Sequence, residues 1–120
     1  MTVFEKIVAG EIPANKVLEN EDFLAFRDIN PRAPIHILVI PKKHFKNIQE
    51  FEPALMAKML EFIQELARLL GVDKSGYKLV TNCGEGAGQE VMHLHFHLLS
   101  GMSLKPELKA PVANDPLAGF

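Results

Sequence analysis

The sequence lacks several features that would place the protein in particular classes. Its single cysteine, Cys83, has no partner for an intramolecular disulfide. No stretch has the length and apolar purity of a membrane span. The first residues include an acid, Glu5, where a secretion signal has basic and then continuously apolar residues. We therefore expect a cytoplasmic protein without a membrane partner.

The sequence also lacks a strong excess of charge of one sign. Thirteen basic and fifteen acidic residues give a formal net charge of −2. Such a chain has no overall field that attracts a nucleic-acid backbone or an anionic membrane. We expect no nucleic-acid partner, and any phosphate binding must come from a local site.

The length and composition indicate one globular domain. A chain of 120 residues with 48% hydrophobic and 23% charged residues can bury a single core but is too short for two domains. Three prolines interrupt any periodicity after Leu104. We expect a domain over residues 1–103, followed by an irregular C-terminal tail over residues 104–120.

Two segments have the signals of helices. Thr2 and Glu5 match a capping box and Gly10 is a suitable stop, which predicts a short helix over Val3–Ala9. A long helix is predicted from Pro53 to the residue before Gly71. Its expected apolar face consists of Leu55, Met59, Leu60, Ile63, Leu66, Ala67 and Leu70.

The strand signals predict a sheet. Two β-rich runs, Lys16–Glu19 and Phe23–Phe26, flank a polar turn and read as a hairpin. Ile35–Ile40 is almost continuously apolar, as in a strand buried on both faces, and Tyr77–Thr81 has the composition of another strand. We expect an α+β fold in which both helices lie on one side of an antiparallel sheet of about five strands.

The most informative segment is the alternating run from His93 to Leu98. Successive side chains of a strand point to opposite faces, so His93, His95 and His97 should point one way and the intervening apolar residues the other. Three imidazoles are difficult to explain by packing, because each has two polar nitrogens and titrates near neutral pH. This pattern indicates a functional site.

One hypothesis for the histidines is a metal site. At about 3.3 Å per residue, the Cα atoms of His93 and His97 are about 13 Å apart, so the three rings cannot converge on one ion. Another ligand would have to come from elsewhere, such as His36, His44 or Glu90. We expect no metal, because no carboxylate is spaced like a ligand of a dedicated site.

The second hypothesis is covalent catalysis at phosphorus. A neutral imidazole attacks the phosphoryl centre while neighbouring groups hydrogen-bond the phosphate or relay a proton. His95 is best placed as the nucleophile, because it has a histidine on each side. The glycine-rich segment Gly84–Gly88 lies directly upstream, and its N–H groups are candidates for binding the α-phosphate. It has no following Lys-Ser or Lys-Thr, so it is not a Walker-type loop.

These residues also resemble a known family. The run His93-Leu94-His95-Phe96-His97-Leu98-Leu99 resembles the His-x-His-x-His-x-x signature of the histidine triad superfamily. Further stretches resemble its Hint branch, namely Phe4-x-Lys6-Ile7 with Glu11-Ile12-Pro13, Phe26-x-Asp28-Ile29-x-Pro31-x-Ala33-Pro34-x-His36, Ile40-Pro41-Lys42-Lys43-His44 and Gly88-Gln89-Glu90-Val91-x-His93. The resemblance runs in order from about residue 4 to residue 99.

The resemblance implies a HIT-like α+β sandwich that pairs into a homodimer with one continuous sheet, through the long helix and a central strand. It implies hydrolysis of purine nucleoside 5′-monophosphoramidates, such as AMP joined to an amine or to lysine, and of aminoacyl adenylates. No metal or other cofactor is implied. A dinucleoside polyphosphate hydrolase and a non-catalytic nucleotide-binding regulatory module are the alternatives.

Carried over position by position, the resemblance makes His95 the residue that is nucleotidylated and then released by water. His93 and His97 support it, and His36 relays protons from behind. The implied nucleotide-binding residues are Ile7, Phe26, Asp28, Ile29, Asn82, Gly88, Gln89 and Glu90, with Asp28 on the ribose hydroxyls.

The chain departs from the family pattern at several positions. Animal members have a serine where this chain has Glu90, and a carboxylate near a phosphate must be turned away, protonated or paired with a cation. The usual Gly-Gly-Arg after the triad is Ser100-Gly101-Met102, and the tail contains no tryptophan. The leaving-group preference is therefore the property that transfers least.

Overall fold

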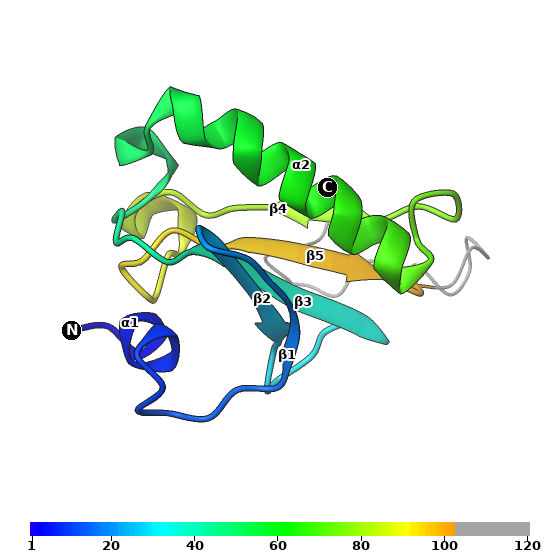
Figure 1. Ribbon diagram of the computed structural model, residues 1–120, viewed down its shortest axis with the longest axis horizontal. Coiled ribbons are helices and arrows are strands. Elements are labelled where there is room, and N and C mark those ends of the chain that lie inside the picture. Colours follow the sequence, from blue (N-terminus) through cyan, green and yellow to red (C-terminus); the bar gives the residue numbers. More distant parts are fainter. Residues whose placement is uncertain (103–120) are drawn as a thin grey trace.

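A five-stranded antiparallel sheet separates two helices in the computed structural model, which describes residues 1–102 (Figure 1). The helices and strands are α1 (Val3–Val8), β1 (Lys16–Glu19), β2 (Phe23–Arg27), β3 (Ile35–Pro41), α2 (Pro53–Leu70), β4 (Lys78–Val80) and β5 (Phe96–Ser100). Two short 3₁₀ helices, Ile48–Glu50 and Glu85–Ala87, lie in the connections. The expected α+β fold with one short and one long helix is confirmed.

The strand order is β1-β2-β3-β5-β4, so β3 lies in the middle of the sheet. In its pairing with β5, His36 lies opposite Leu99 and Leu38 lies opposite His97. The strand that contains His97 is thus next to the strand that contains His36. β4 pairs with β5 and ends the sheet.

Helix α2 covers one face of the sheet and closes the larger core. It begins at Pro53, where a missing N–H costs no hydrogen bond, and ends at Gly71, whose φ of 73° suits glycine. Met59, Ile63 and Leu66 are fully buried, as expected. Leu60 was expected on this face but is 47% exposed, whereas Phe62 is 2% exposed. One residue step turns a helix by about 100°, which carries Leu60 from Met59 to the edge of the face.

Helix α1 lies on the other face, so the expectation that both helices share one side of the sheet is wrong (Figure 1). Phe4 and Ile7 pack there in a second core cluster. The physical reason lies in β2 and β3, which are apolar at alternate positions on both faces and need cover on both. The second cluster consists of Phe4, Ile7, Leu24, Phe26, Leu38 and Ile40.

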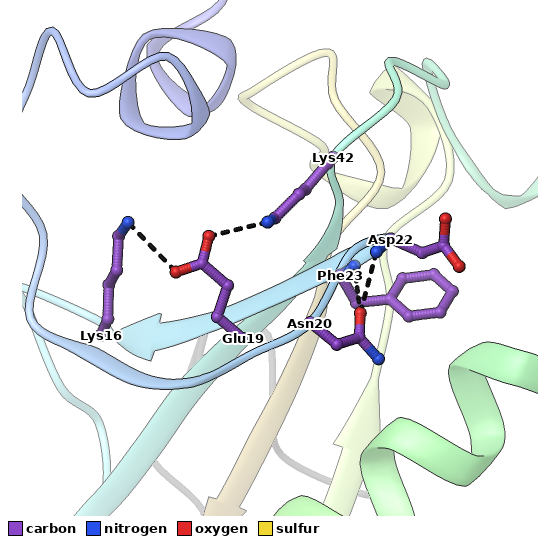
Figure 2. Close-up of polar contacts among 6 residues, drawn as sticks. All are labelled: Lys16, Glu19, Asn20, Asp22, Phe23 and Lys42. Atoms are coloured by element: carbon purple, nitrogen blue, oxygen red, sulfur yellow. Dashed lines mark hydrogen bonds and ion pairs between the residues drawn. The ribbon is translucent and has the colours of Figure 1, made fainter.

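The predicted hairpin forms between β1 and β2, and Figure 2 shows the side chain that closes its turn. Asn20 Oδ1 accepts hydrogen bonds from the N–H groups of Asp22 at 2.9 Å and Phe23 at 2.8 Å. Nearby, Glu19 is paired with Lys42 at 2.7 Å and Lys16 at 3.3 Å. Asparagine favours turns because its side chain replaces backbone partners in this way.

The remaining strand boundaries differ slightly from the expectations. β4 is shorter than the predicted Tyr77–Thr81, and the β5 ladder begins at Phe96, so His93 and His95 lie just before it. The predicted tail, 104–120, lies outside the described residues. No helix within residues 1–102 combines the length and the apolar character that crossing a membrane requires.

Candidate active site

A cavity of about 910 Å³ opens between α1, the β2–β3 connection and the segment before β5. This volume is in the range of small-molecule sites. Most of the residues singled out in the sequence line it, namely Ile7, Phe26, Asp28, Ile29, His36, Asn82, Gly88, Gln89, Glu90, His95 and His97. His93 does not line it.

The histidine rings lie opposite the intervening apolar side chains, as the alternation predicted, and the face they occupy is the one that α1 covers. Leu94, Phe96 and Leu98 pack into the core under α2. The ring of His95 meets that of His97 edge-on, with centroids 5.1 Å apart. The extended geometry that produces alternating sides therefore continues upstream of the formal start of β5.

His95 is held by its backbone and by one ring nitrogen. Its Nδ1 lies 2.7 Å from the main-chain carbonyl oxygen of His93, and because a carbonyl only accepts, Nδ1 carries the proton. Its own carbonyl accepts a hydrogen bond from the Thr81 hydroxyl at 2.8 Å. A neutral His95 ring therefore has its lone pair on Nε2, the atom that a nucleophile needs.

His97 is the end of a chain of hydrogen bonds that starts on the β2–β3 connection. The N–H of Arg32 donates to His36 Nδ1 at 3.1 Å, which places the His36 proton on Nε2. His36 Nε2 then donates to His97 Nδ1 at 2.9 Å, and Asp28 Oδ2 lies 3.5 Å from the same Nε2. The remaining proton of a neutral His97 is therefore on Nε2.

His93 is fully buried behind the cavity and has a different role from its neighbours. Its Nε2 donates to the carbonyl oxygen of Pro41 at 2.8 Å. Two further bonds fix the same segment, since His44 Nε2 donates to the Met92 carbonyl at 2.7 Å and the Leu94 N–H donates to the Phe45 carbonyl at 2.7 Å. His93 thus anchors the backbone that precedes His95.

Burial keeps these rings neutral. It lowers the pKa of His97 to about 4, helped by the neighbouring His95 and His36. Burial also lowers the pKa of His95, although the bond to the His93 carbonyl and the Asp28 carboxylate oppose this. The pKa values of His36 and His93 are lowered by burial as well. Near pH 7 these four histidine rings are therefore uncharged.

The backbone N–H groups of the glycine-rich segment form more hydrogen bonds within the segment than expected. The N–H groups of Ala87, Gly88 and Gln89 donate to carbonyls of Gly84 and Glu85, and the Gly84 N–H donates to Gln89 Oε1. Of the N–H groups that the sequence suggested as phosphate donors, those of Gly84, Ala87 and Gly88 therefore already have acceptors within the protein. Internal bonding satisfies them, and Gly88, with a φ of 78°, closes the turn that forms this wall of the cavity.

Gln89 is buried, and its side-chain amide is used for structure. Its Oε1 accepts from the Gly84 N–H, and its Nε2 donates to the carbonyls of Lys46 at 2.7 Å and Val91 at 3.0 Å. The amide of Asn82 likewise donates to Ala87 at 2.7 Å. Both residues line the cavity while they hold its loop in place.

Part of the cavity lining is apolar, and a carboxylate from Asp28 lies beside it. Ile7 and Phe26 are buried there, whereas Ile29 is 92% exposed at the rim. Asp28 Oδ1 accepts from the Asn30 N–H at 2.8 Å, which fixes the orientation of the carboxylate. Glu90 is exposed on the wall next to the glycine-rich segment.

Two groups of side chains have the spacing of potential metal ligands, with their nearest ligand atoms within 4.8 Å of one another. Asp28, His36 and His97 form one group, and Glu5, His44 and His93 form the other. His93 and His97 belong to different groups, which agrees with the argument that the triad cannot converge on one ion. In both groups the histidine nitrogens already have hydrogen-bond partners.

Sequence reasoning missed Phe4 as a residue of the site. It lines the cavity, and its ring meets that of His95 edge-on with centroids 5.1 Å apart. The available signal was its spacing, because Phe4 lies three residues before Ile7 and therefore on the same face of the short helix. Leu38, which lines the cavity from β3, was also missed for lack of any distinguishing signal.

Comparison with known proteins places this geometry in a family. The HIT domain model matches residues 9–104. An uncharacterized HIT-like protein of Helicobacter pylori (strain ATCC 700392 / 26695) is 59% identical over 101 residues, covering 84% of this chain and 97% of that protein.

Two solved structures are similar in sequence and in fold. A HIT family hydrolase from Legionella pneumophila Philadelphia 1 is 46% identical with a TM-score of 0.80, covering 88% of this chain and 99% of its own. A histidine triad nucleotide-binding protein from Candida albicans is 35% identical with a TM-score of 0.77, covering 82% and 73%. The family match and the arrangement of the three histidines agree, and the chain belongs to the HIT, or histidine triad, family.

Proposed function

We propose that the protein hydrolyses purine nucleoside 5′-monophosphoramidates through a covalent nucleotidyl intermediate on His95. The observation that carries this proposal is the tautomer of His95, whose Nδ1 proton is held by a carbonyl while Nε2 keeps its lone pair on the cavity wall. The descriptions of the similar structures as a hydrolase and as a nucleotide-binding protein support it.

In the first step, Nε2 of His95 attacks the α-phosphorus and the bond from phosphorus to the amine nitrogen breaks. The bound phosphoramidate anion places one additional proton on the His36–His97 pair, the leaving nitrogen takes a proton from His97 Nε2, and the amine departs from a pair that is again neutral. The ring of His95 becomes positively charged when it is bonded to phosphorus. The His93 carbonyl, 2.7 Å from Nδ1, stabilises this charge, since hydrogen bonds to charged donors are stronger than neutral ones.

In the second step, water attacks the same phosphorus and the bond to His95 Nε2 breaks. The deprotonated Nε2 of His97 accepts the proton from water, so the products are the nucleoside monophosphate and the amine with both histidines restored. Asp28 and His36 assist because they stabilise a transient positive charge on the relay. No metal is needed in this sequence of steps.

Recognition of the nucleoside is assigned to the apolar part of the cavity lining. Phe26 and Ile7 offer apolar surface to a purine, and Asp28 offers a carboxylate acceptor to the ribose hydroxyls. Asn82, Gly88, Gln89 and Glu90 form the wall beside the phosphate.

The deciding experiment uses a fluorogenic AMP-amine phosphoramidate, with and without EDTA, beside a His95→Ala variant. Release of amine that is insensitive to EDTA and absent in the variant is the expected result. Binding of AMP without turnover would instead favour a regulatory module, and loss of activity with EDTA would favour a metal-dependent reaction. Faster cleavage of a dinucleoside polyphosphate would move the protein to that class of hydrolase.

The proposal includes a homodimer formed through α2 and β4. β4 ends the described sheet, and Leu79 on it is 39% exposed. Leu60 and Leu69 on α2 are 47% and 59% exposed. A second copy that extends the sheet at β4 would cover such apolar surface.

Sedimentation at micromolar concentration tests the dimer. Leu79→Lys is expected to give monomers, whereas Ile48→Lys, at a comparably exposed apolar residue outside α2 and β4, should leave the dimer intact. A monomeric native protein would contradict this part of the proposal.

A further inference from the structure

The first turn of α1 is connected to the triad by a side chain that the proposed mechanism does not use. The Thr2 hydroxyl oxygen accepts a hydrogen bond from the Glu5 N–H at 3.1 Å, and Glu5 Oε1 accepts one from the Thr2 N–H at 2.9 Å. These two bonds form the capping box. The same hydroxyl lies 3.4 Å from His93 Nδ1, ninety-one residues along the chain.

The hydrogen bonds of the His93 ring determine which atom is the donor in the contact between Thr2 and His93. Because Nε2 donates its proton to the Pro41 carbonyl, a neutral ring has only a lone pair at Nδ1. His93 is 0% exposed, so water does not supply a partner. The Thr2 hydroxyl accepts from Glu5 through its oxygen and has its proton available for Nδ1.

The position of His93 is in turn coupled to His95. The His93 carbonyl receives the Nδ1 proton of His95 at 2.7 Å, which leaves His95 Nε2 unprotonated. Phe4, two residues after Thr2, meets both rings edge-on, with centroids 6.0 Å from His93 and 5.1 Å from His95. The first turn of α1 therefore contacts both rings.

We propose that Thr2 is a positioning residue for the nucleophile: its hydroxyl donates to His93 Nδ1, fixes the His93 tautomer that bonds to Pro41, and so holds the carbonyl that orients His95. This inference rests on the proposed function of His95. Thr2 does not touch the substrate; it acts through His93.

Other charged groups also face His93 and bear on its protonation. Glu5 on α1 favours a positive charge on the ring, whereas His44 and His95 oppose it. The ring of His44 lies edge-on to that of His93 at 5.2 Å. Without a donor at Thr2, the buried lone pair of Nδ1 has no partner, so the ring is expected to exchange tautomer or take up a proton.

Three variants separate this role from helix capping. Thr2→Val keeps the shape of the side chain but removes the donor and the cap, and Thr2→Ser keeps both. Glu5→Ala removes the other half of the capping box and leaves the Thr2 hydroxyl in place. For each variant, kcat and KM are measured with an AMP-amine phosphoramidate, AMP binding by calorimetry, the melting temperature, and the tautomer of His93 by ¹⁵N NMR.

The expected result is a fall in kcat of about tenfold for Thr2→Val, with KM and AMP affinity little changed and an altered His93 ¹⁵N pattern. Thr2→Ser should restore the native values. Glu5→Ala should lower the melting temperature without lowering kcat. Native kcat in Thr2→Val, an equal loss of kcat in Glu5→Ala, or an unchanged His93 pattern would overturn the inference. Absence of turnover in the native protein would contradict the proposed function instead, and the ¹⁵N pattern would still test the contact.

Discussion

The two faces of the sheet are built from the same strands but differ in what they bury. The face under α2 is closed by a large apolar cluster, from Phe23 on β2 to Leu98 on β5. The face under α1 combines a smaller apolar cluster with His36, His93, His95 and His97. The larger core supplies stability, and the smaller one leaves room for a cavity whose polar groups have partners. The large apolar core and the histidine cluster thus lie on opposite faces of one sheet.

The largest expected effect is a loss of kcat caused by a substitution on the α1 face. His97→Gln should lower kcat for an AMP-amine phosphoramidate by about 10²- to 10⁴-fold, because the leaving amine loses its acid. The melting temperature should change little. If kcat is preserved with a poor leaving group such as an alkylamine, the assignment of His97 as the acid is wrong.

A substitution in the core under α2 should have the complementary effect, which is to lower the stability of the protein and leave kcat unchanged. Ile63→Ala removes a fully buried side chain from α2 and should lower the free energy of unfolding by about 2–5 kcal/mol. Urea denaturation measures this loss. Below the transition, kcat per folded molecule should match that of the native protein, and a large fall in kcat would show that the two faces are not separate.

Acid should affect the α1 face selectively. The pKa of His97 falls from 6.5 to about 4 on folding, so between these values the unfolded chain binds more protons than the folded one. The contribution of His97 to stability is therefore complete above pH 6.5 and is lost as the pH falls toward 4. Unfolding free energies measured across this range should decline less in His97→Gln than in the native protein.

The smallest expected effect concerns the exposed Glu90 on the cavity wall. A carboxylate at this position should favour leaving amines that carry a second, positively charged group. Glu90→Gln is expected to reduce the preference for such an amine over a neutral one of equal length by about two- to fivefold. Equal ratios of kcat/KM in the two proteins would remove Glu90 from leaving-group selection.

The sequence predicted local features well, because periodicity and turn chemistry are local. The alternation from His93 to Leu98 placed the rings opposite the core, and Asn20 marked the hairpin. The sheet face that each helix covers was not predictable in this way. Periodicity shows that α1 has an apolar face, but the need for cover on the second face of the sheet follows only from the packing of β2 and β3.

In the site, too, local features could be predicted from the sequence whereas contacts between distant segments could not. His36 and Asp28 meet His97 because strands and loops far apart in sequence are paired, and no spacing shows the 2.9 Å bond. Gln89 looked like a phosphate ligand but has its amide bonded to three backbone groups. Residue type suggested the chemistry, while the partner of each nitrogen and oxygen required the fold.

The antiparallel register between β3 and β5 has a consequence for the fidelity of folding. A shift of one residue would turn every side chain of the segment from His93 to Leu98 to the other face. Three imidazoles would then enter the apolar layer beneath α2, and Leu94, Phe96 and Leu98 would lie on the side of the cavity. The alternation therefore also destabilises chains that pair in the wrong register, so a molecule that has folded with a complete core has placed its three histidines on the α1 face in the same step.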